Sequence, residues 1–444
     1  MSERFDVIVV GSGAGGGLIA GELADAGVSV LLLEAGPHRT AADFTRWEAH
    51  ANHDIWFPPT LVQAAAAGAP PLAVIRGRCV GGTTTVNTKV ALRPSDDDYA
   101  KWHAASGLVG AAGDPFAAAD MAPHFDRVAA RLGVRERSDW QQCIRTVVPG
   151  FQALGAELEP VMSYTDANCM RCGSCLQGCP TNAGKNSMNV YIHPPWAQGR
   201  LTLRAGCTVQ RVVIEHRGSG PEATGIEYRD ADGGSHAVDA SAVVVAGGAM
   251  ATPQLLLRSG IREAAGGSAS SRLVGRHVGW HPARIIAGLF DEPQDAHMVY
   301  PISAHCMKFQ RDADGGFIVE AATIQDPIGF AIMVADEDGV PMWGRELSET
   351  VRRYRYFSGL LTMVTDENNG TAWIDEDGRD RYSYAWSAVE QARDVAAQQF
   401  AREALLAAGA TRVLPSSQSS THVQGGCRMG SDPERSVVDD HAES

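Results

Sequence analysis

No apolar run in the sequence reaches the length of about 18 residues that a membrane-spanning helix needs. There is also no basic, apolar leader at the start, because a strand-like segment already begins at Phe5. We therefore expect a cytoplasmic protein with no membrane span. Basic residues are outnumbered, 38 against 52 acidic ones, and the net charge of −14 disfavours nucleic acid or an anionic membrane surface as a partner.

The sequence likewise contains no internal repeat and no low-complexity tract. Hydrophobic residues make up 44% of it and charged residues 20%, which is the profile of a globular protein. A chain of 444 residues exceeds what one ordinary core accommodates, so we expect two or three domains. The 48 glycines indicate many tight turns and close backbone approaches.

The chain opens with the pattern of a dinucleotide-binding fold. A β-branched run over residues 5–10 predicts a strand buried on both faces, and a G-x-G-x-x-G motif follows it directly. An amphipathic helix, a second apolar run over residues 28–33 and an acidic residue come next, in that order. The positions that carry this pattern are Gly11, Gly13, Gly16 and Glu34.

Each of these positions has a physical role. Gly11 permits the tight turn, Gly13 lets the backbone approach a pyrophosphate, and Gly16 allows the helix to pack closely on the strand. The N-terminus of the helix offers free N–H groups to the phosphates. Glu34 lies where an acid accepts hydrogen bonds from ribose hydroxyls. The motif predicts a dinucleotide site but does not by itself distinguish FAD from a nicotinamide cofactor.

A second glycine-rich segment favours flavin. Residues 76–102 read RGRCVGGTTTVNTKVALRPSDDDYAKW. Gly81 and Gly82 let backbone amides approach a planar ligand without a Cβ clash, and the Asn87 amide can satisfy a polar ring edge. Without a ligand, the same residues would be a glycine turn between a strand and a threonine-rich strand.

This segment resembles the first signature of the glucose–methanol–choline (GMC) oxidoreductase family. In that family R-G-x-x-x-G-G-S-S-x-x-N runs beneath the flavin, and a Tyr-x-x-Trp pair follows. Thr83 and Thr84 stand where the family has two serines, which keeps the hydroxyls. The matching positions are Arg76, Gly77, Gly81, Gly82, Asn87, Tyr99 and Trp102.

Two further segments resemble the same family and imply FAD as the cofactor. Residues 243–261, VVVAGGAMATPQLLLRSGI, are similar to its second signature, with a buried strand, a double glycine and a helix that we expect to open near Thr252 and Pro253. The last glycine of the family's closing S-G-x-G is lost here. Ahead of it, residues 207–212 resemble the strand that packs the main chain of a valine, here Val209, against the adenine.

The last match lies near the end of the chain. Residues 422–430, HVQGGCRMG, and the V-V-D at 437–439 resemble a motif after which the family continues to a catalytic His. This sequence stops at Ser444, so we expect that base to be absent and the chain to be a fragment, a truncated product or half of a split enzyme. His422 and His441 are candidates for the role. The resemblance, however, gives His422 a place in a turn that shapes the site, and it puts His441 before the return to the flavin.

Four of the nine cysteines form a tight cluster. Residues 169–180 read CMRCGSCLQGCP, which is the C-x2-C-x2-C-x3-C-P spacing of a bacterial ferredoxin loop. Three interpretations stay open: an iron–sulfur cluster that carries electrons from flavin to an acceptor, a structural zinc ion, and thiols without metal. Cys143 or Cys207 could complete a ligand set. The candidate ligands are Cys169, Cys172, Cys175 and Cys179.

We expect an α/β fold, α+β overall, with a Rossmann-like FAD-binding domain and a second, substrate domain built on an antiparallel sheet. The FAD-binding domain would take residues 1–160, continue over 201–283 and return, incomplete, at 416–444. A cysteine-rich loop would occupy 161–200, and the substrate domain 284–415.

Apolar runs in the substrate domain predict four strands and a helix that covers their sheet. The predicted strands are residues 317–322, 330–334, 360–365 and 371–375, and the predicted helix is residues 389–408.

The predicted reaction moves a hydride from the CH–OH carbon of a small-molecule alcohol to the flavin N5, while a base takes the hydroxyl proton. The electrons would pass to an acceptor protein or to oxygen. One alternative is a catalytically incomplete FAD-binding or electron-transfer subunit that needs a partner chain. A third, a nicotinamide-dependent reductase, would leave the segments around Gly81 and Gly247 without a role. The sequence does not identify the alcohol.

Overall fold

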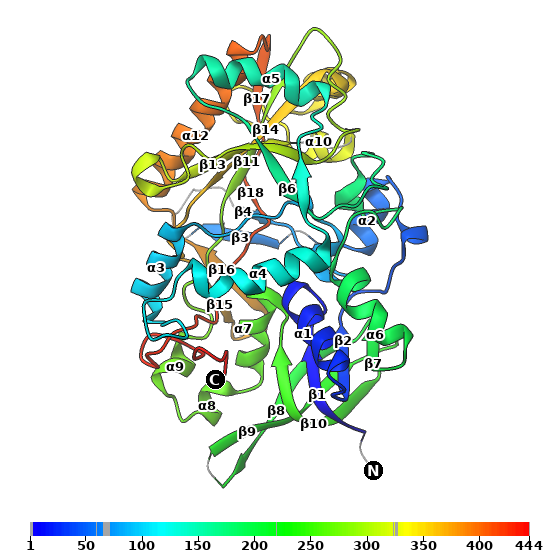
Figure 1. Cartoon of the computed structure of the whole chain (residues 1–444), viewed down its shortest axis with the longest axis vertical. Coiled ribbons are helices and arrows are strands. Elements are labelled where there is room, and N and C mark those ends of the chain that lie inside the picture. Colours follow the sequence, from blue (N-terminus) through cyan, green and yellow to red (C-terminus); the bar gives the residue numbers. More distant parts are fainter. Residues whose placement is uncertain are drawn as a thin grey trace.

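The computed structural model describes residues 3–58, 60–64, 72–218, 220–322, 324 and 327–443. Within these residues the strands form two sheets: the smaller one lies at the lower end of an elongated molecule, and the larger one extends from the upper part to the middle (Figure 1). The smaller sheet contains β1 (Arg4–Val10), β2 (Val30–Glu34), β7 (Leu201–Ala205), β8 (Thr208–Arg217), β9 (Gly220–Arg229) and β10 (Ser235–Val245). Their order across the sheet is β7-β2-β1-β10-β9-β8.

The smaller sheet has the arrangement of a dinucleotide-binding fold. β7, β2, β1 and β10 run parallel, and β9 and β8 complete the sheet in antiparallel pairs. Ile8 and Leu31 are fully buried in one core, and Val9 and Leu32 are fully buried in another. The first two strands are therefore buried on both faces, as the apolar runs predicted.

The larger sheet is mostly antiparallel. Its strands are β3 (Thr60–Ala64), β4 (Leu72–Val74), β5 (Arg135–Arg137), β6 (Glu159–Ser163), β11 (Ala283–Leu289), β12 (Ile302–Cys306), β13 (Phe317–Ala322), β14 (Phe357–Val364), β15 (Thr371–Ile374), β16 (Asp380–Tyr384), β17 (Arg412–Pro415) and β18 (Ser419–Ser420). Their order is β15-β16-β3-β4-β18-β11-β14-β13-β12-β6-β5, with β17 paired to β11. Among the described residues of this larger sheet, the parallel strand pairs are β16–β3 and β18–β4.

Helices cover both sheets. They are α1 (Ala14–Asp25), α2 (Glu48–Asp54), α3 (Asp96–Ser106), α4 (Ala118–Leu132), α5 (Gln142–Ala153), α6 (His193–Ala197), α7 (Gly248–Arg258), α8 (Ile261–Ala264), α9 (Ala269–Leu273), α10 (Pro327–Met333), α11 (Gly344–Arg352) and α12 (Ala388–Ala407). α5 and α12 pack against each other in the main core of the larger sheet. A Cβ added at Gly150 would lie 1.9 Å from the Ala404 carbonyl oxygen, so this close crossing requires glycine.

Most of the elements predicted over residues 284–415 are confirmed, as β13, β14, β15 and α12. The strand predicted over residues 330–334 is wrong, because most of this segment belongs to α10. The Glu48 carboxylate accepts hydrogen bonds from the N–H groups of Ile328 and Gly329, both at 3.0 Å, and so caps the helix. Phe330 is buried while Ile328 and Ile332 are exposed, which is a helical and not an alternating pattern.

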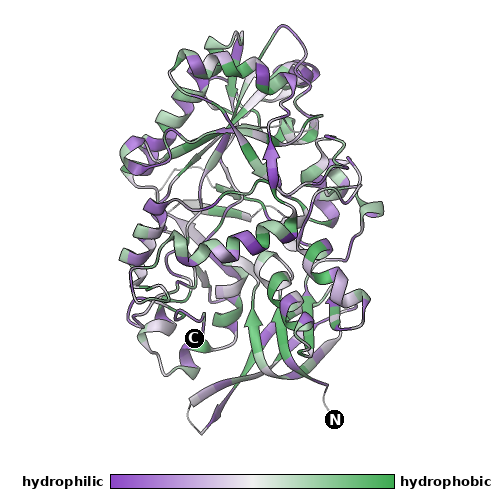
Figure 2. Ribbon diagram, viewed as in Figure 1, coloured by the Kyte–Doolittle hydropathy of each residue, from purple (hydrophilic) through white to green (hydrophobic). Residues whose placement is uncertain are grey.

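The predicted fold class is confirmed: a Rossmann-like domain is joined to a second domain on a mostly antiparallel sheet. In the smaller sheet β1 and β2 are largely apolar, whereas the projecting ends of β8 and β9 carry polar residues (Figure 2). β3, β4, β5 and β6 belong to the larger sheet although they precede β7 in the chain, so the two sheets are interleaved in sequence. No helix in the described part of the chain combines the length and hydrophobicity that crossing a bilayer requires.

Candidate functional site

The glycine loop after β1 has the geometry that its sequence predicts. Gly11 has a φ of 95°, and a Cβ at this position would lie 2.5 Å from the carbonyl oxygen of Ala246. A Cβ at Gly16 would lie 1.9 Å from the Gly11 oxygen, so α1 packs directly on the loop. Gly13 differs, because no heavy atom lies within 4 Å of its Cβ position. The loop is closed beneath Gly11 and Gly16 and open at Gly13, where a ligand would approach.

Hydrogen bonds to the Glu34 carboxylate connect this loop to the end of β2. One carboxylate oxygen accepts hydrogen bonds from the backbone N–H of Ser12 at 3.1 Å and from its hydroxyl at 2.6 Å. The other accepts the N–H of Gly36 at 2.8 Å. Since a carboxylate oxygen has two lone pairs, the first oxygen is fully used, and the oxygen that accepts Gly36 can still accept a ribose hydroxyl. Contact with a ribose stays a prediction.

The second glycine segment lies directly against the first. The N–H of Gly81 donates to the Ser12 hydroxyl at 3.0 Å, and a Cβ at Gly82 would lie 2.8 Å from the Gly13 Cα. Residues Gly82–Thr85 form a 3-10 helix (η2) and not the threonine-rich strand of the ligand-free alternative. Thr83 accepts the N–H of Gly77 through its hydroxyl at 3.0 Å, which closes the turn.

Two more segments meet the glycine loop. The backbone N–H of Ala246 donates to Val10 at 2.8 Å, which brings the N-terminus of α7 beside that of α1. α7 begins at Gly248 and not near Thr252 as we expected, so Pro253 lies inside the helix. Ser187 had no predicted role. Its hydroxyl donates to the Ser12 carbonyl at 3.0 Å, and its backbone N–H donates to the Thr84 hydroxyl at 2.9 Å. Its partners are far away in sequence, so no local pattern marks it.

Two predicted cofactor residues remain, Val209 and Asn87. The N–H of Cys207 donates to the Glu34 carbonyl at 2.8 Å, which places Val209, two residues further on, near the end of β2. The Asn87 amide donates to the Tyr164 hydroxyl at 2.6 Å, so part of its hydrogen-bonding capacity is already used. Its contact with a flavin edge stays a prediction.

Two histidines from distant segments form a pair. The Nδ1 atoms of His281 and His422 are 2.9 Å apart, so one ring donates and the other accepts. Desolvation lowers the pKa of both imidazoles, and that of His281 falls to about 3 because His422 adds to the effect. The two rings therefore hold one another in neutral form. Of the pair, His422 was a predicted candidate and His281 was not.

Comparison with protein families matches residues 6–283 to the GMC oxidoreductase family. The chain belongs to the GMC oxidoreductase family. An uncharacterised GMC-type oxidoreductase of Mycobacterium tuberculosis H37Rv is 33% identical over 97% of this chain and 63% of its own length. A long-chain-alcohol oxidase of Arabidopsis thaliana is 24% identical over 86% of this chain and 50% of its own length. The chain thus spans less than two thirds of the length of these relatives.

Solved structures show the same fold. A pyridoxine 4-oxidase from "Mesorbium loti" superposes with a TM-score of 0.74 at 19% identity, over 99% of this chain and 92% of that one. A formate oxidase of Aspergillus oryzae RIB40 superposes with a TM-score of 0.70 at 14% identity, over 99% and 91%. At these identities the likeness concerns the fold.

The cysteine loop of this GMC oxidoreductase surrounds a pocket of its own. All four cysteines of the predicted cluster line it, together with Thr165 and Tyr300 from neighbouring segments. Cys143 and Cys207 lie instead in two separate hydrophobic cores, so the expectation that either completes the set is wrong. Among the described residues, no group of three or more His, Cys, Asp or Glu side chains is arranged to hold a metal ion.

A buried lysine connects the cysteine pocket to the second glycine segment. Lys89 is 0% exposed, and its ammonium donates to the carbonyl oxygens of Thr84 and Thr85 at the end of η2. Burial lowers the pKa of Lys89 to about 8. Our sequence analysis missed this residue, although a single lysine in the otherwise uncharged run of residues 79–92 was an available signal.

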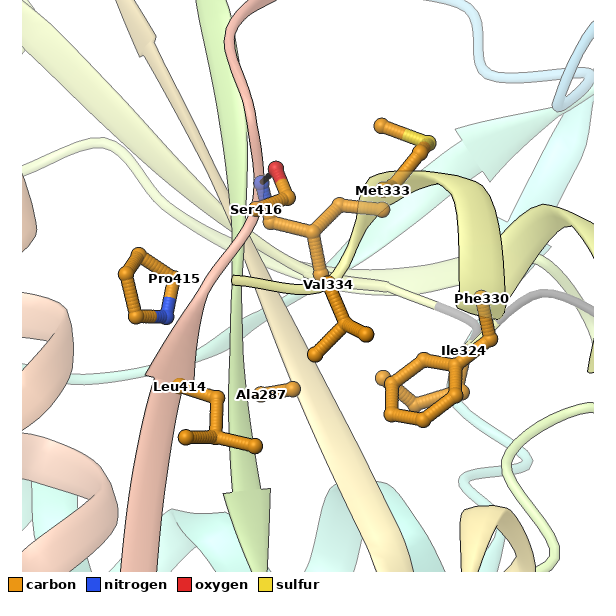
Figure 3. Close-up of a pocket in the computed structure, with 9 residues that line it drawn as sticks. Ala287, Ile324, Phe330, Met333, Val334, Leu414, Pro415 and Ser416 are labelled. Carbon is orange, nitrogen blue, oxygen red and sulfur yellow. Dashed lines mark hydrogen bonds between the residues drawn. The ribbon is translucent and has the colours of Figure 1, made fainter. Parts of the chain in front are cut away.

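A further pocket of the GMC oxidoreductase lies on the larger sheet beneath α10 (Figure 3). Its lining is apolar except for one serine, and the residues are Ile285, Ala287, Ile324, Phe330, Met333, Val334, Leu414, Pro415 and Ser416. None of these side chains is titratable, so the pocket offers an apolar wall and no group for proton transfer.

Proposed function

We propose that this chain binds FAD and oxidises the CH–OH group of a small-molecule alcohol. The observation that carries the proposal is the contact between the two glycine segments, where a Cβ at Gly82 would meet the Gly13 Cα at 2.8 Å. The N-termini of α1 and α7 meet at the same place and can direct N–H groups and positive dipole ends at a pyrophosphate. Bound FAD would supply the hydride acceptor at N5.

In the proposed complex each segment contacts a different part of FAD. The glycine loop would hold the pyrophosphate, Glu34 the ribose, and the second glycine segment would lie beneath the flavin ring. The backbone of Val209 would pack on the adenine. The full proposed set is Gly11, Gly13, Gly16, Glu34, Gly81, Gly82, Thr83, Asn87 and Val209.

The hydroxyl proton of the alcohol needs an acceptor. A general base works best when its pKa lies near the working pH, so His281, with a pKa of about 3, is a poor one. His422 is the better candidate of the pair, and His281 would fix its tautomer. Because the pKa of both histidines is lowered, neither is a strong base. This favours a second candidate function, an FAD-binding or electron-transfer subunit that takes its base from a partner chain.

Flavin reduction under anaerobic conditions tests both candidates. We expect purified protein to be yellow, to release FAD on denaturation, and to be bleached by an alcohol from a panel of primary and secondary alcohols. Loss of bleaching in His422→Ala but not in the exposed control His216→Ala would identify His422 as the base. A yellow protein that no alcohol bleaches would support the subunit function, and a colourless protein that takes up no FAD would contradict both.

Three finer features belong to the same proposal. The electrons would leave to an acceptor protein or to oxygen, and residence in the cytoplasm stays a prediction. The iron–sulfur cluster predicted for the cysteine loop is also proposed. The contacts around its pocket favour the acceptor protein over oxygen.

A further inference from the structure

The cysteine loop is folded so that four thiols face one space. Gly173 and Gly178 have φ values of 75° and 93°, and between them residues Ser174–Gln177 form a 3-10 helix (η3) that carries Cys175. A Cβ at Gly173 would lie 2.0 Å from the His297 carbonyl oxygen, so the loop is held closely against the chain beside it. Cys175 is 8% exposed, and the other three thiols are half-buried along the same pocket.

The pocket also contains hydrogen-bond donors of the kind that stabilise sulfur ligands. The N–H of Gly184 donates to the Cys179 sulfur at 3.2 Å. The Ser174 hydroxyl lines the pocket, is 1% exposed, and has no hydrogen-bond partner among the described residues. Hydrogen bonds to cluster sulfurs are among the features that set the potential of an iron–sulfur centre.

Two cations lie next to these thiols. The titratable groups that interact with the Lys89 ammonium are cysteine thiols, Cys175 and Cys179 in the loop and Cys79 outside it. The Arg137 guanidinium lies 4.9 Å from the centroid of the Tyr300 ring and donates to the Thr165 hydroxyl, and both of these partners line the pocket. Cations in this position would offset the negative charge that four thiolates bring to a buried centre.

The sequence spacing of the four cysteines is typical of a cluster loop and not of a single zinc ion. A tetrahedral zinc site with bonds of about 2.3 Å requires its sulfurs about 3.8 Å apart. No described group of side chains is arranged to hold one ion, yet all four sulfurs share one pocket. An iron–sulfur core is wider than one ion, because inorganic sulfide lies between its irons, and it takes thiolates at the spacing found in this loop.

The pocket is also next to the proposed flavin site. Lys89 donates to the end of η2, and a Cβ at Gly184 would lie 3.0 Å from its Cε and 3.4 Å from the Cys179 Cβ. A single side chain therefore lies between the second glycine segment and the cysteine loop.

We propose that Cys169, Cys172, Cys175 and Cys179 bind an iron–sulfur cluster that takes electrons from the reduced flavin, a role that rests on the flavin function proposed above. Each oxidised alcohol would leave a hydride, which is two electrons and one proton, on the flavin and its hydroxyl proton on the base. The protons return to solvent, and the electrons pass one at a time through the cluster to two equivalents of a one-electron carrier protein. The protein would then act as a dehydrogenase and not as an oxidase.

Anaerobic purification of the whole chain, with assays of iron, acid-labile sulfide and FAD and an EPR spectrum after dithionite reduction, tests this proposal. We expect about four irons and four sulfides for each chain and a reduced-cluster signal. Cys172→Ser should lose the signal and most of the iron, whereas the core control Cys306→Ala should keep both. FAD content reports whether each variant is folded.

The two proposals fail in different ways. Iron-free protein with bound FAD and four titratable loop thiols, or stoichiometric zinc in place of iron, would overturn the cluster and leave the flavin function standing. Protein with the cluster but no capacity for FAD would overturn the flavin function and leave the cluster site standing. Iron that persists in Cys172→Ser and Cys179→Ser would overturn the ligand assignment.

Discussion

Glu320 is a carboxyl group in an environment that disfavours its charge. It lies on β13 with 3% of its surface exposed, and burial raises its pKa to about 7. In the unfolded chain a glutamate releases its proton near pH 4.3. Between these values the folded protein binds more protons, so this residue makes stability fall as pH rises from about 4 to about 7, with no further change above that.

We predict that Glu320→Gln is more stable than the parent at pH 8, and that the advantage disappears near pH 4. The amide keeps the shape of the protonated acid and cannot ionise, and the gain should be at most roughly 4 kcal/mol. Urea unfolding at both pH values measures it, with the exposed Glu349→Gln as the control. An equal difference at both pH values would show that the residue does not titrate in the folded state as described.

Some residues of the proposed flavin site can be predicted from sequence, and others cannot. The roles of Gly11 and Gly16 follow from the backbone conformation of a short segment, so a local motif is sufficient to find them. Ser187 and Lys89 act through hydrogen bonds to Ser12 and to η2, and nothing beside them in sequence indicates these partners. Residues whose partners are distant in sequence can be found only once the fold is known.

The helix α10 also depends on a partner that is distant in sequence, and for this reason its secondary structure was not predicted. Its apolar residues favoured a strand by composition, but its N-terminus is capped by Glu48, about 280 residues away in sequence. β1, β2 and the helix α12 were predictable, because continuous apolar runs define the two strands and a Ser387–Glu390 capping box marks the start of the helix. Tertiary hydrogen bonds decided the structure only where the local pattern was short.

We predict that Glu48→Ala loosens α10. The change removes the carboxylate whose two oxygens accept the N–H groups of Ile328 and Gly329, one each, and loss of such a cap costs about 1–2 kcal/mol. Hydrogen exchange at these two amides should become faster, and urea unfolding should show the loss of stability. The control is Glu349→Ala in α11, which is exposed. Unchanged exchange in Glu48→Ala would mean that the carboxylate does not cap the helix.

At the scale of the whole molecule, the glycine loop lies in the middle of the elongated chain, between the two sheets (Figure 1). It occupies the carboxyl end of β1, where open α/β sheets bind their ligands. The sequence predicted both sheets and the order of the family's motifs. It did not predict that β3 to β6 would join the larger sheet, because strand pairing across hundreds of residues has no local signal.

The central claim is that FAD binds at the open side of the glycine loop, and FAD titration of Gly13→Ala tests it most directly. The Cβ position at Gly13 is free of neighbours and its φ is −65°, so alanine should fold normally while its methyl group occupies the space of the pyrophosphate. Gly15→Ala, also free of neighbours, is the matched control. We predict that Gly13→Ala weakens FAD binding about tenfold or more, equivalent to about 1.4 kcal/mol, while Gly15→Ala binds like the parent. Equal FAD affinity in Gly13→Ala and the parent would contradict the account.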